Sequence, residues 1–91
     1  MRTIYKYVAP IEDEVTIVTF CRAKFLTVQD QYGALCFWFE VENTEECTKE
    51  YKFRIFGTGH QVSGEHLLYH GSVQQMGGRL VWHIYEEVQL S

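Results

Sequence analysis

The stretch ALCFWFEVE, residues 34–42, indicates most clearly how this chain folds. Its large apolar side chains occupy every second position: Leu35, Phe37, Phe39 and Val41. The positions between them hold Cys36, Trp38 and Glu40. Such period-two alternation is typical of a β-strand with one face in a core. An outward Trp38 on so small a domain indicates that the second face is covered too, by a sheet, a subunit or a ligand.

The same alternation continues on both sides of this stretch. Six further segments show it: TIYKYVA (3–9), VTIVTF (15–20), KFLTVQD (24–30), YKFRIF (51–56), LLYHGSVQQ (67–75) and LVWHIYEEV (80–88). Short strands at turn spacings of about 8–12 residues predict an all-β antiparallel sandwich or small barrel. We therefore expect a single domain, residues 1–91, of about seven strands. Its predicted core is Leu35, Phe37, Phe39, Tyr51, Phe53, Ile55, Val73, Trp82 and Ile84.

The last two segments form a predicted hairpin. The Gly-Gly pair at 77–78 favours a type I′ turn, because both central residues of that turn need positive φ. The register that follows from this turn puts Tyr69 on the apolar face. It puts His70, His83 and Tyr85 on the opposite face, which is polar, uncharged and rich in ring donors and acceptors.

Charge and cysteine content limit the class of protein. The net charge is −4 and the basic residues are scattered, which makes duplex nucleic acid a poor partner. A small anionic ligand needs only one or two cations and a few amides. No apolar run approaches the roughly 20 residues of a membrane helix. Because the three cysteines form no CxxC pair and no leader pattern precedes the first strand, we expect free, mostly buried thiols in a reducing cytoplasm.

The run RIFGTGH, residues 54–60, is the candidate ligand site. Its five predicted ligand-binding residues are Arg54, Gly57, Thr58, Gly59 and His60. An arginine fork and a threonine hydroxyl bind phosphate oxygens, and glycines let backbone amides converge on them. Four rings are candidates for stacking on a base: Trp38, Phe56, His83 and Tyr85. The alternative is a glycine corner that only turns the chain.

Catalytic and metal chemistry find weaker support in the sequence. His66 and His70 have a spacing that aligns two ligands on a helix, but they fall at a predicted loop-to-strand junction. Ser72 and His83 face each other in the predicted hairpin without an acidic partner. Cys47 lies in an acidic link that suppresses its thiolate. We predict a protein that is no enzyme and has neither a metal site nor a cofactor.

Two long motifs resemble a family of short uncharacterised proteins encoded by bacteriophages and prophages. They are YKFRIFGTGH (51–60) and YHGSVQQMGGRLVWHIYE (69–86), and the opening MRTIYKY and AKFLTVQ (23–29) fit the same pattern. The resemblance covers most of the chain, and its most specific parts are FRI-x-GTGH and GG-x-LVWH.

By analogy, small phage proteins without catalytic motifs are often counter-defence factors. Some are oligomeric sponges that sequester the nucleotide signals of bacterial immunity. The small core and the polar-aromatic second faces predict a homo-oligomer. With this analogy, we expect it to act in the host cytoplasm and to bind a small phosphorylated signal, such as a cyclic nucleotide, without altering it. The alternative is an inhibitor that binds a host enzyme or other host protein, with Trp38, Phe56 and Tyr85 as anchors.

Overall fold

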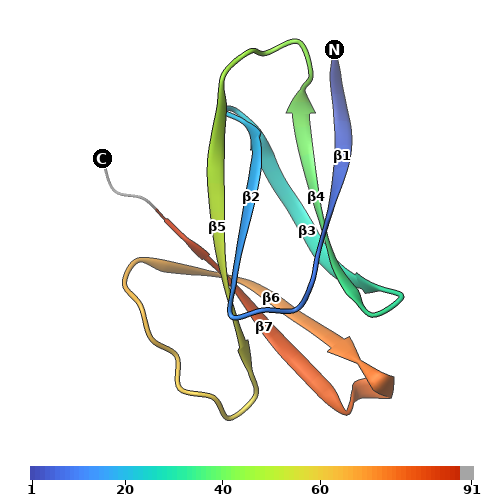
Figure 1. Cartoon of the computed structure of the whole chain (residues 1–91), viewed down its shortest axis with the longest axis vertical. Coiled ribbons are helices and arrows are strands. Elements are labelled where there is room, and N and C mark those ends of the chain that lie inside the picture. Colours follow the sequence, from blue (N-terminus) through green and yellow to red (C-terminus); the bar gives the residue numbers. More distant parts are fainter. Residues whose placement is uncertain (89–91) are drawn as a thin grey trace.

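The computed structural model describes residues 1–88, and in this part the chain forms two antiparallel β-sheets (Figure 1). The strands are β1 (Arg2–Ala9), β2 (Glu14–Phe20), β3 (Lys24–Gln31), β4 (Ala34–Glu42), β5 (Thr48–Gly57), β6 (Leu67–Gln75) and β7 (Leu80–Glu87). One sheet has three strands in the order β1-β4-β3, and the other has four in the order β2-β5-β7-β6. The predicted all-β sandwich class is confirmed. No helix among the described residues is long and apolar enough to cross a membrane.

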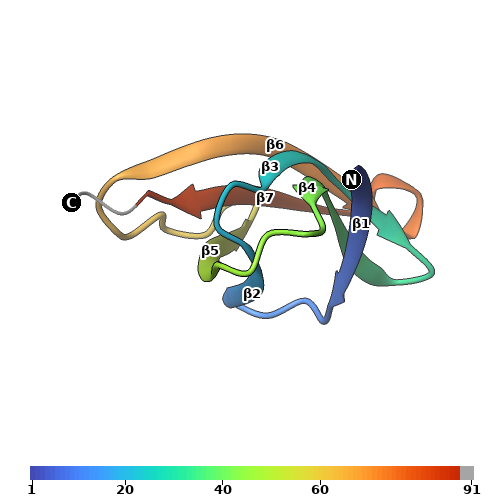
Figure 2. The same cartoon turned by 90° about the horizontal axis from the view of Figure 1, so that it is seen from above.

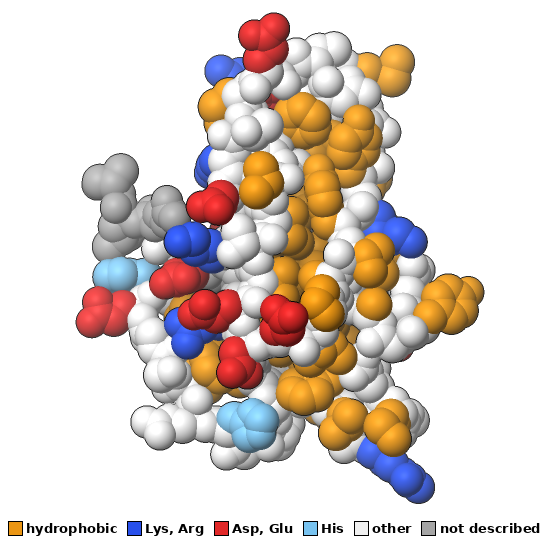
Figure 3. All heavy atoms as spheres, viewed as in Figure 1, with side chains coloured by type: hydrophobic (Ala, Val, Ile, Leu, Met, Phe, Trp, Pro, Cys, Tyr) orange, Lys and Arg blue, Asp and Glu red, His pale blue; other side chains and the backbone are white. Residues whose placement is uncertain are grey.

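The core lies between the two sheets, as the alternation of residues 34–42 predicts. Phe37, Phe39 and Phe53 are completely buried, and the Phe37 and Phe53 rings join the sheets at a centroid distance of 4.7 Å. Every predicted core residue is buried except Trp82, which is half-buried at the edge of the cluster. Figure 3 shows a band of hydrophobic side chains down the middle of the view, between the positions of β2 and β1 in Figure 1, with acidic side chains grouped beside its lower half.

The end of the β2–β5 ladder corrects two expectations. The ladder extends to the pair of Phe20 and Thr48, so β5 begins three residues before the predicted strand at 51–56. Just beyond it, Cys21 and Cys47 form a disulfide with a Cα–Cα distance of 5.4 Å. The expectation of free thiols is therefore wrong for these two cysteines, because strand pairing brings together residues 26 positions apart. Cys36 is free and buried as expected.

A β-bulge changes the predicted register of the β6–β7 hairpin. The turn itself is as predicted, since Gly77 and Gly78 have φ of 68° and 92°. The register shifts between Tyr69 and Gly71, which adds one residue to β6. His70 therefore points inward and Tyr69 pairs with Tyr85 on the outer face, so the predicted positions of Tyr69 and His70 are wrong.

Side chains join the two sheets where β3 passes β6, and Figure 2 shows these strands running close together. The Phe25 and His70 rings lie 4.4 Å apart, and Nε2 of Gln75 donates to Oδ1 of Asp30 at 2.7 Å. Both contacts join a residue of β3 to one 45 positions later, so the two strands run parallel along this seam. His70 also contacts Oε1 of Glu86 at 2.8 Å.

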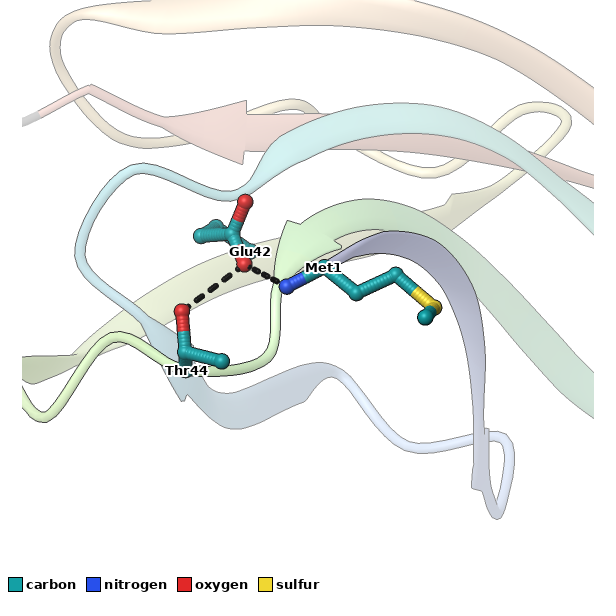
Figure 4. A network of polar contacts seen from close by, with 3 residues as sticks. All are labelled: Met1, Glu42 and Thr44. Atoms are coloured by element: carbon teal, nitrogen blue, oxygen red, sulfur yellow. Dashed lines mark hydrogen bonds and ion pairs between the residues drawn. The ribbon is translucent and has the colours of Figure 1, made fainter.

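The first residue is held to the end of β4 by a small polar network (Figure 4). The terminal ammonium of Met1 and the hydroxyl of Thr44 both donate to Oε1 of Glu42. The backbone of Asn43 also donates to the Met1 carbonyl at 3.1 Å. These bonds hold the pKa of the Glu42 carboxyl below its usual value, the ammonium contact being the main cause.

Candidate functional site

The outer face of the four-stranded sheet brings together four of the predicted site residues. β5 and β7 pair so that Arg54 lies opposite Tyr85, and Phe56 lies opposite His83. All four side chains therefore project from the same face, away from the core. The period-two pattern predicts this correctly, because neither β5 nor β7 has a bulge in their shared ladder.

Arg54 is the least satisfied polar side chain of this face. It is only 21% exposed, and its Nε is buried without a hydrogen-bond partner among residues 1–88. Oε1 of Glu14, itself 71% exposed, lies 3.6 Å from that nitrogen. The guanidinium carbon lies 5.8 Å from the centroid of the Phe56 ring. Gly64 passes beside the other end of the group, since an added Cβ there would lie 3.5 Å from Nη1.

In the glycine loop, residues 57–60, three backbone amides already donate to acceptors in the protein. The amide of Gly57 donates to Nδ1 of His60 at 3.1 Å, and the amide of His60 returns to the Gly57 carbonyl at 3.0 Å. The amide of Thr58 donates to the Val81 carbonyl at 3.2 Å. A side chain at Gly57 would clash with His60, whose Cε1 lies 2.9 Å from the Cβ position. In this structure Gly57 and His60 therefore form a tight corner, and Gly59, with φ of 92°, completes it.

A chain of hydrogen bonds crosses the same face. Thr58 Oγ1 lies 2.9 Å from Nε2 of His83, and Nδ1 of His83 lies 3.1 Å from the Tyr69 hydroxyl. Both ring nitrogens of His83 thus have protein partners. Tyr69 is 49% exposed and belongs to this site, although the sequence reading placed it in the core face. Its only signal in the sequence is Gly71, because glycine inside a strand often marks a bulge.

The aromatic rings form a row from β5 to β6. Phe56 contacts Tyr85 edge to face at 5.7 Å, and Tyr85 contacts Tyr69 at 5.1 Å. Phe56 is only 8% exposed, so its ring faces are already covered by protein. Tyr69 is the ring of this row with most surface open to a ligand.

Trp38 lies away from this row, on the outer face of the three-stranded sheet. It pairs with Lys6 of β1 and Thr27 of β3. With Ile4 and Leu26 it lines a shallow groove of about 380 Å³. Alternation predicts that Trp38 points outward but does not predict which sheet it belongs to. Because Trp38 and Arg54 lie on the outer faces of different sheets, they cannot form one site.

The hollow next to Arg54 carries charges of both signs. It measures about 250 Å³ and is lined by residues of β2, β5 and β7: Glu14, Val15, Thr16, Lys52, Phe53, Arg54 and Glu87. Arg54 and Lys52 supply two cations to it, and Glu14 and Glu87 supply two carboxylates.

Comparison with curated proteins and with solved structures found no match to this chain. A comparison with protein families found one match, which runs from residue 1 to residue 91. The chain therefore belongs to the family described as a domain of unknown function, DUF7352.

Proposed function

We propose that this protein binds and sequesters a small phosphorylated ligand, without catalysis, on the outer face of its four-stranded sheet. The observation that carries the proposal is the Arg54 guanidinium, which is mostly buried while its Nε has no hydrogen-bond partner among residues 1–88. A buried N–H group without an acceptor is costly, and the Glu14 carboxylate at 3.6 Å is too far from Nε to satisfy it. A phosphate oxygen in the place of the exposed Glu14 carboxylate would supply the missing acceptor.

The neighbours of Arg54 support a ligand with a ring as well as a phosphate. Lys52 adds a second cation on the same side of β5. Tyr69 and Tyr85 lie on the strands beyond, at the strand spacing of about 5 Å. A nucleotide has a phosphate that Arg54 and Lys52 can bind and a base that can stack on a tyrosine. Such stacking is worth about 1–3 kcal/mol per base in single-strand binders.

The biological role that we propose is counter-defence in a phage-infected cell. It rests on the resemblance of the motifs at 51–60 and 69–86 to phage and prophage proteins. Sequestration of a cyclic nucleotide signal needs affinity and no turnover. We place this activity in the host cytoplasm, where such signals act.

A thermal-shift panel of cyclic dinucleotides, cyclic trinucleotides and ADP-ribose derivatives tests the proposal. At a hundredfold excess over the dissociation constant, a ligand stabilises the fold by about 2.7 kcal/mol, which raises Tm by many degrees in a domain of this size. We expect Arg54→Ala to abolish the shift. The matched control is Arg79→Ala, which removes an exposed arginine from the β6–β7 turn.

Recovery of the nucleotide distinguishes binding from turnover. Intact nucleotide released from the denatured complex supports sequestration, and a cleaved product would point to an enzyme instead. If no member of the panel shifts Tm, the anion proposal fails.

A second candidate function, inhibition of a host protein, is favoured by the face around Trp38. Ile4 and Val8 are 57% and 61% exposed there, more than an isolated domain needs on one sheet. Three cations (Arg2, Lys6 and Lys24) and two carboxylates (Glu40 and Glu42) lie on the same face, so it has a net charge of +1 while the whole chain has a net charge of −4. This candidate predicts an acidic host partner whose binding is lost in Trp38→Ala but kept in Arg54→Ala.

We also propose that the protein self-associates. Tyr5 of β1 is 37% exposed, and its ring centroid lies 6.0 Å from that of Phe20 of β2. Figure 3 shows a band of exposed hydrophobic side chains on this side of the molecule. A second copy would cover this hydrophobic band. Light scattering at tens of micromolar should give a multiple of the 10.7 kDa chain mass, and a strict monomer would refute self-association.

A further inference from the structure

We propose that Cys21, Glu45 and Cys47 bind a divalent thiophilic cation of the zinc class when the two cysteines are reduced. One ligand atom from each residue lies within 4.8 Å of the other two, and among residues 1–88 this is the one cluster with such spacing. Two thiolates and a carboxylate are ligands that zinc prefers. As in zinc sites with three protein ligands, the fourth position would hold water.

The backbone holds these three residues in place before any cation arrives. The amide of Cys21 donates to the Cys47 carbonyl at 2.9 Å, which continues the β2–β5 ladder by one pair. The amide of Glu45 donates to the Glu42 carbonyl at 3.0 Å, and Oε2 of Glu45 accepts from the amide of Arg22 at 3.4 Å. Such support lowers the entropy lost on metal binding.

A second group fixes the turn that carries Cys21. The Tyr51 hydroxyl lies 2.9 Å from the Phe20 carbonyl and 3.2 Å from the carbonyls of Cys21 and Ala23. This contact involves no sulfur, so it holds the turn in both redox states. The ligands therefore stay close when the disulfide opens.

The disulfide and the cation exclude each other, because both use the same sulfur atoms. A phosphine reductant opens the disulfide by taking up an oxygen atom from water, which leaves two thiols. The cation then replaces the two thiol protons, which are released to the solvent. In a reducing compartment the dithiol is the form that persists, so the metal site is the one available there.

This site is separate from the proposed ligand site. Cys47 and Arg54 lie seven residues apart along β5 and its approach, which corresponds to about 23 Å in an extended chain. A failure of nucleotide binding leaves the metal proposal untouched, and the reverse also holds.

A cobalt titration of the reduced protein without oxygen tests the proposal. Co²⁺ reports thiolate ligation through a charge-transfer absorption that water or carboxylate ligands alone do not give. We expect one Co²⁺ per chain, displaced by Zn²⁺, with that absorption present. The double variant Cys21→Ser/Cys47→Ser should lose it, and Glu45→Gln should weaken binding by at least about tenfold, a loss seen even for outer-shell partners.

Two controls separate the site from other thiols and from unfolding. Cys36→Ser removes the buried third thiol and should leave the titration unchanged. The oxidised wild-type protein has the same sequence and fold but no free Cys21 or Cys47, and it should show no charge-transfer band. The proposal is overturned if the reduced wild type gives no band, or if the double variant binds Co²⁺ equally well.

Discussion

Tyr51 shows how one hydroxyl can hold a turn. Its ring is 7% exposed, and its hydroxyl is shared among three carbonyls of residues 20–23. Burial raises the pKa of the Tyr51 phenol above its usual 10.0. The neutral phenol is therefore favoured by folding. Its contribution to stability is fully present below about pH 10 and is lost as the pH rises through the raised value.

We predict that Tyr51→Phe lowers the free energy of unfolding at pH 7 by about 1–2 kcal/mol, because the carbonyls lose their donor. Between pH 7 and 11, the wild type should lose more stability than the variant. Urea unfolding measures both effects. Tyr32→Phe alters a fully exposed tyrosine and is the control. Parallel pH profiles of wild type and Tyr51→Phe would contradict the prediction.

Glu42 gives the opposite dependence at acid pH. Its carboxyl accepts from the Met1 ammonium and the Thr44 hydroxyl, and its pKa is lowered in the folded protein (Figure 4). The stability that it contributes is present above its usual pKa of 4.5 and is lost as the pH falls through the lowered value. Glu42→Gln should therefore flatten the acid side of the stability profile. Glu46→Gln, in the neighbouring loop, should leave that slope unchanged if the network is the cause.

At the scale of one element, Gly71 sets the course of β6. Its φ of 123° is a backbone conformation that residues with a side chain rarely adopt, although an added Cβ would touch nothing within 4 Å. We expect Gly71→Ala to destabilise the protein by about 1–3 kcal/mol through backbone strain alone. Chemical denaturation with Ser72→Ala as the matched variant isolates this effect. If both variants unfold at the same denaturant concentration, the bulge is not under strain.

Strand bounds and strand faces differ in how well the sequence predicts them. Alternation locates each strand to within a few residues. The largest difference is in β5, whose first three residues, 48–50, are polar and lie outside the predicted strand. A bulge reverses the faces on one side of it, so everything in β6 before Gly71 is predicted on the wrong side, including Tyr69. Period-two alternation cannot predict an added residue, because a bulge depends on how the strand pairs with its neighbour and not on the strand's own pattern.

At the scale of the molecule, the core is small enough for one ring to decide folding. Phe37 is completely buried and packs on Phe53 across the two sheets. Phe37→Ala should cost roughly 3–5 kcal/mol, a large share of the stability of a domain this size. Circular dichroism at increasing temperature should show little or no folded protein. Val18→Ala, which trims a side chain that is 56% exposed, should melt close to the wild type.

Only part of the candidate site can be predicted from the sequence, because the sequence pattern does not specify which strands pair. Arg54, Phe56, His83 and Tyr85 meet because β5 and β7 are neighbours, which their alternation permits but does not specify. Trp38 has the same outward pattern and lies on the other sheet. Sheet membership depends on which strands pair, and this is decided by packing over the whole chain.

The strand order has a consequence for how the protein emerges from the ribosome. β1 pairs with β4 and β2 pairs with β5, so neither of the first two strands has its partner when it is made. β2 ends at residue 20 and β5 at residue 57, 37 residues later. At common rates of synthesis this leaves β2 without its ladder for roughly 2–7 s. During that interval the apolar side chains of β2 are open to chaperones, and the rate of translation sets how long they stay so.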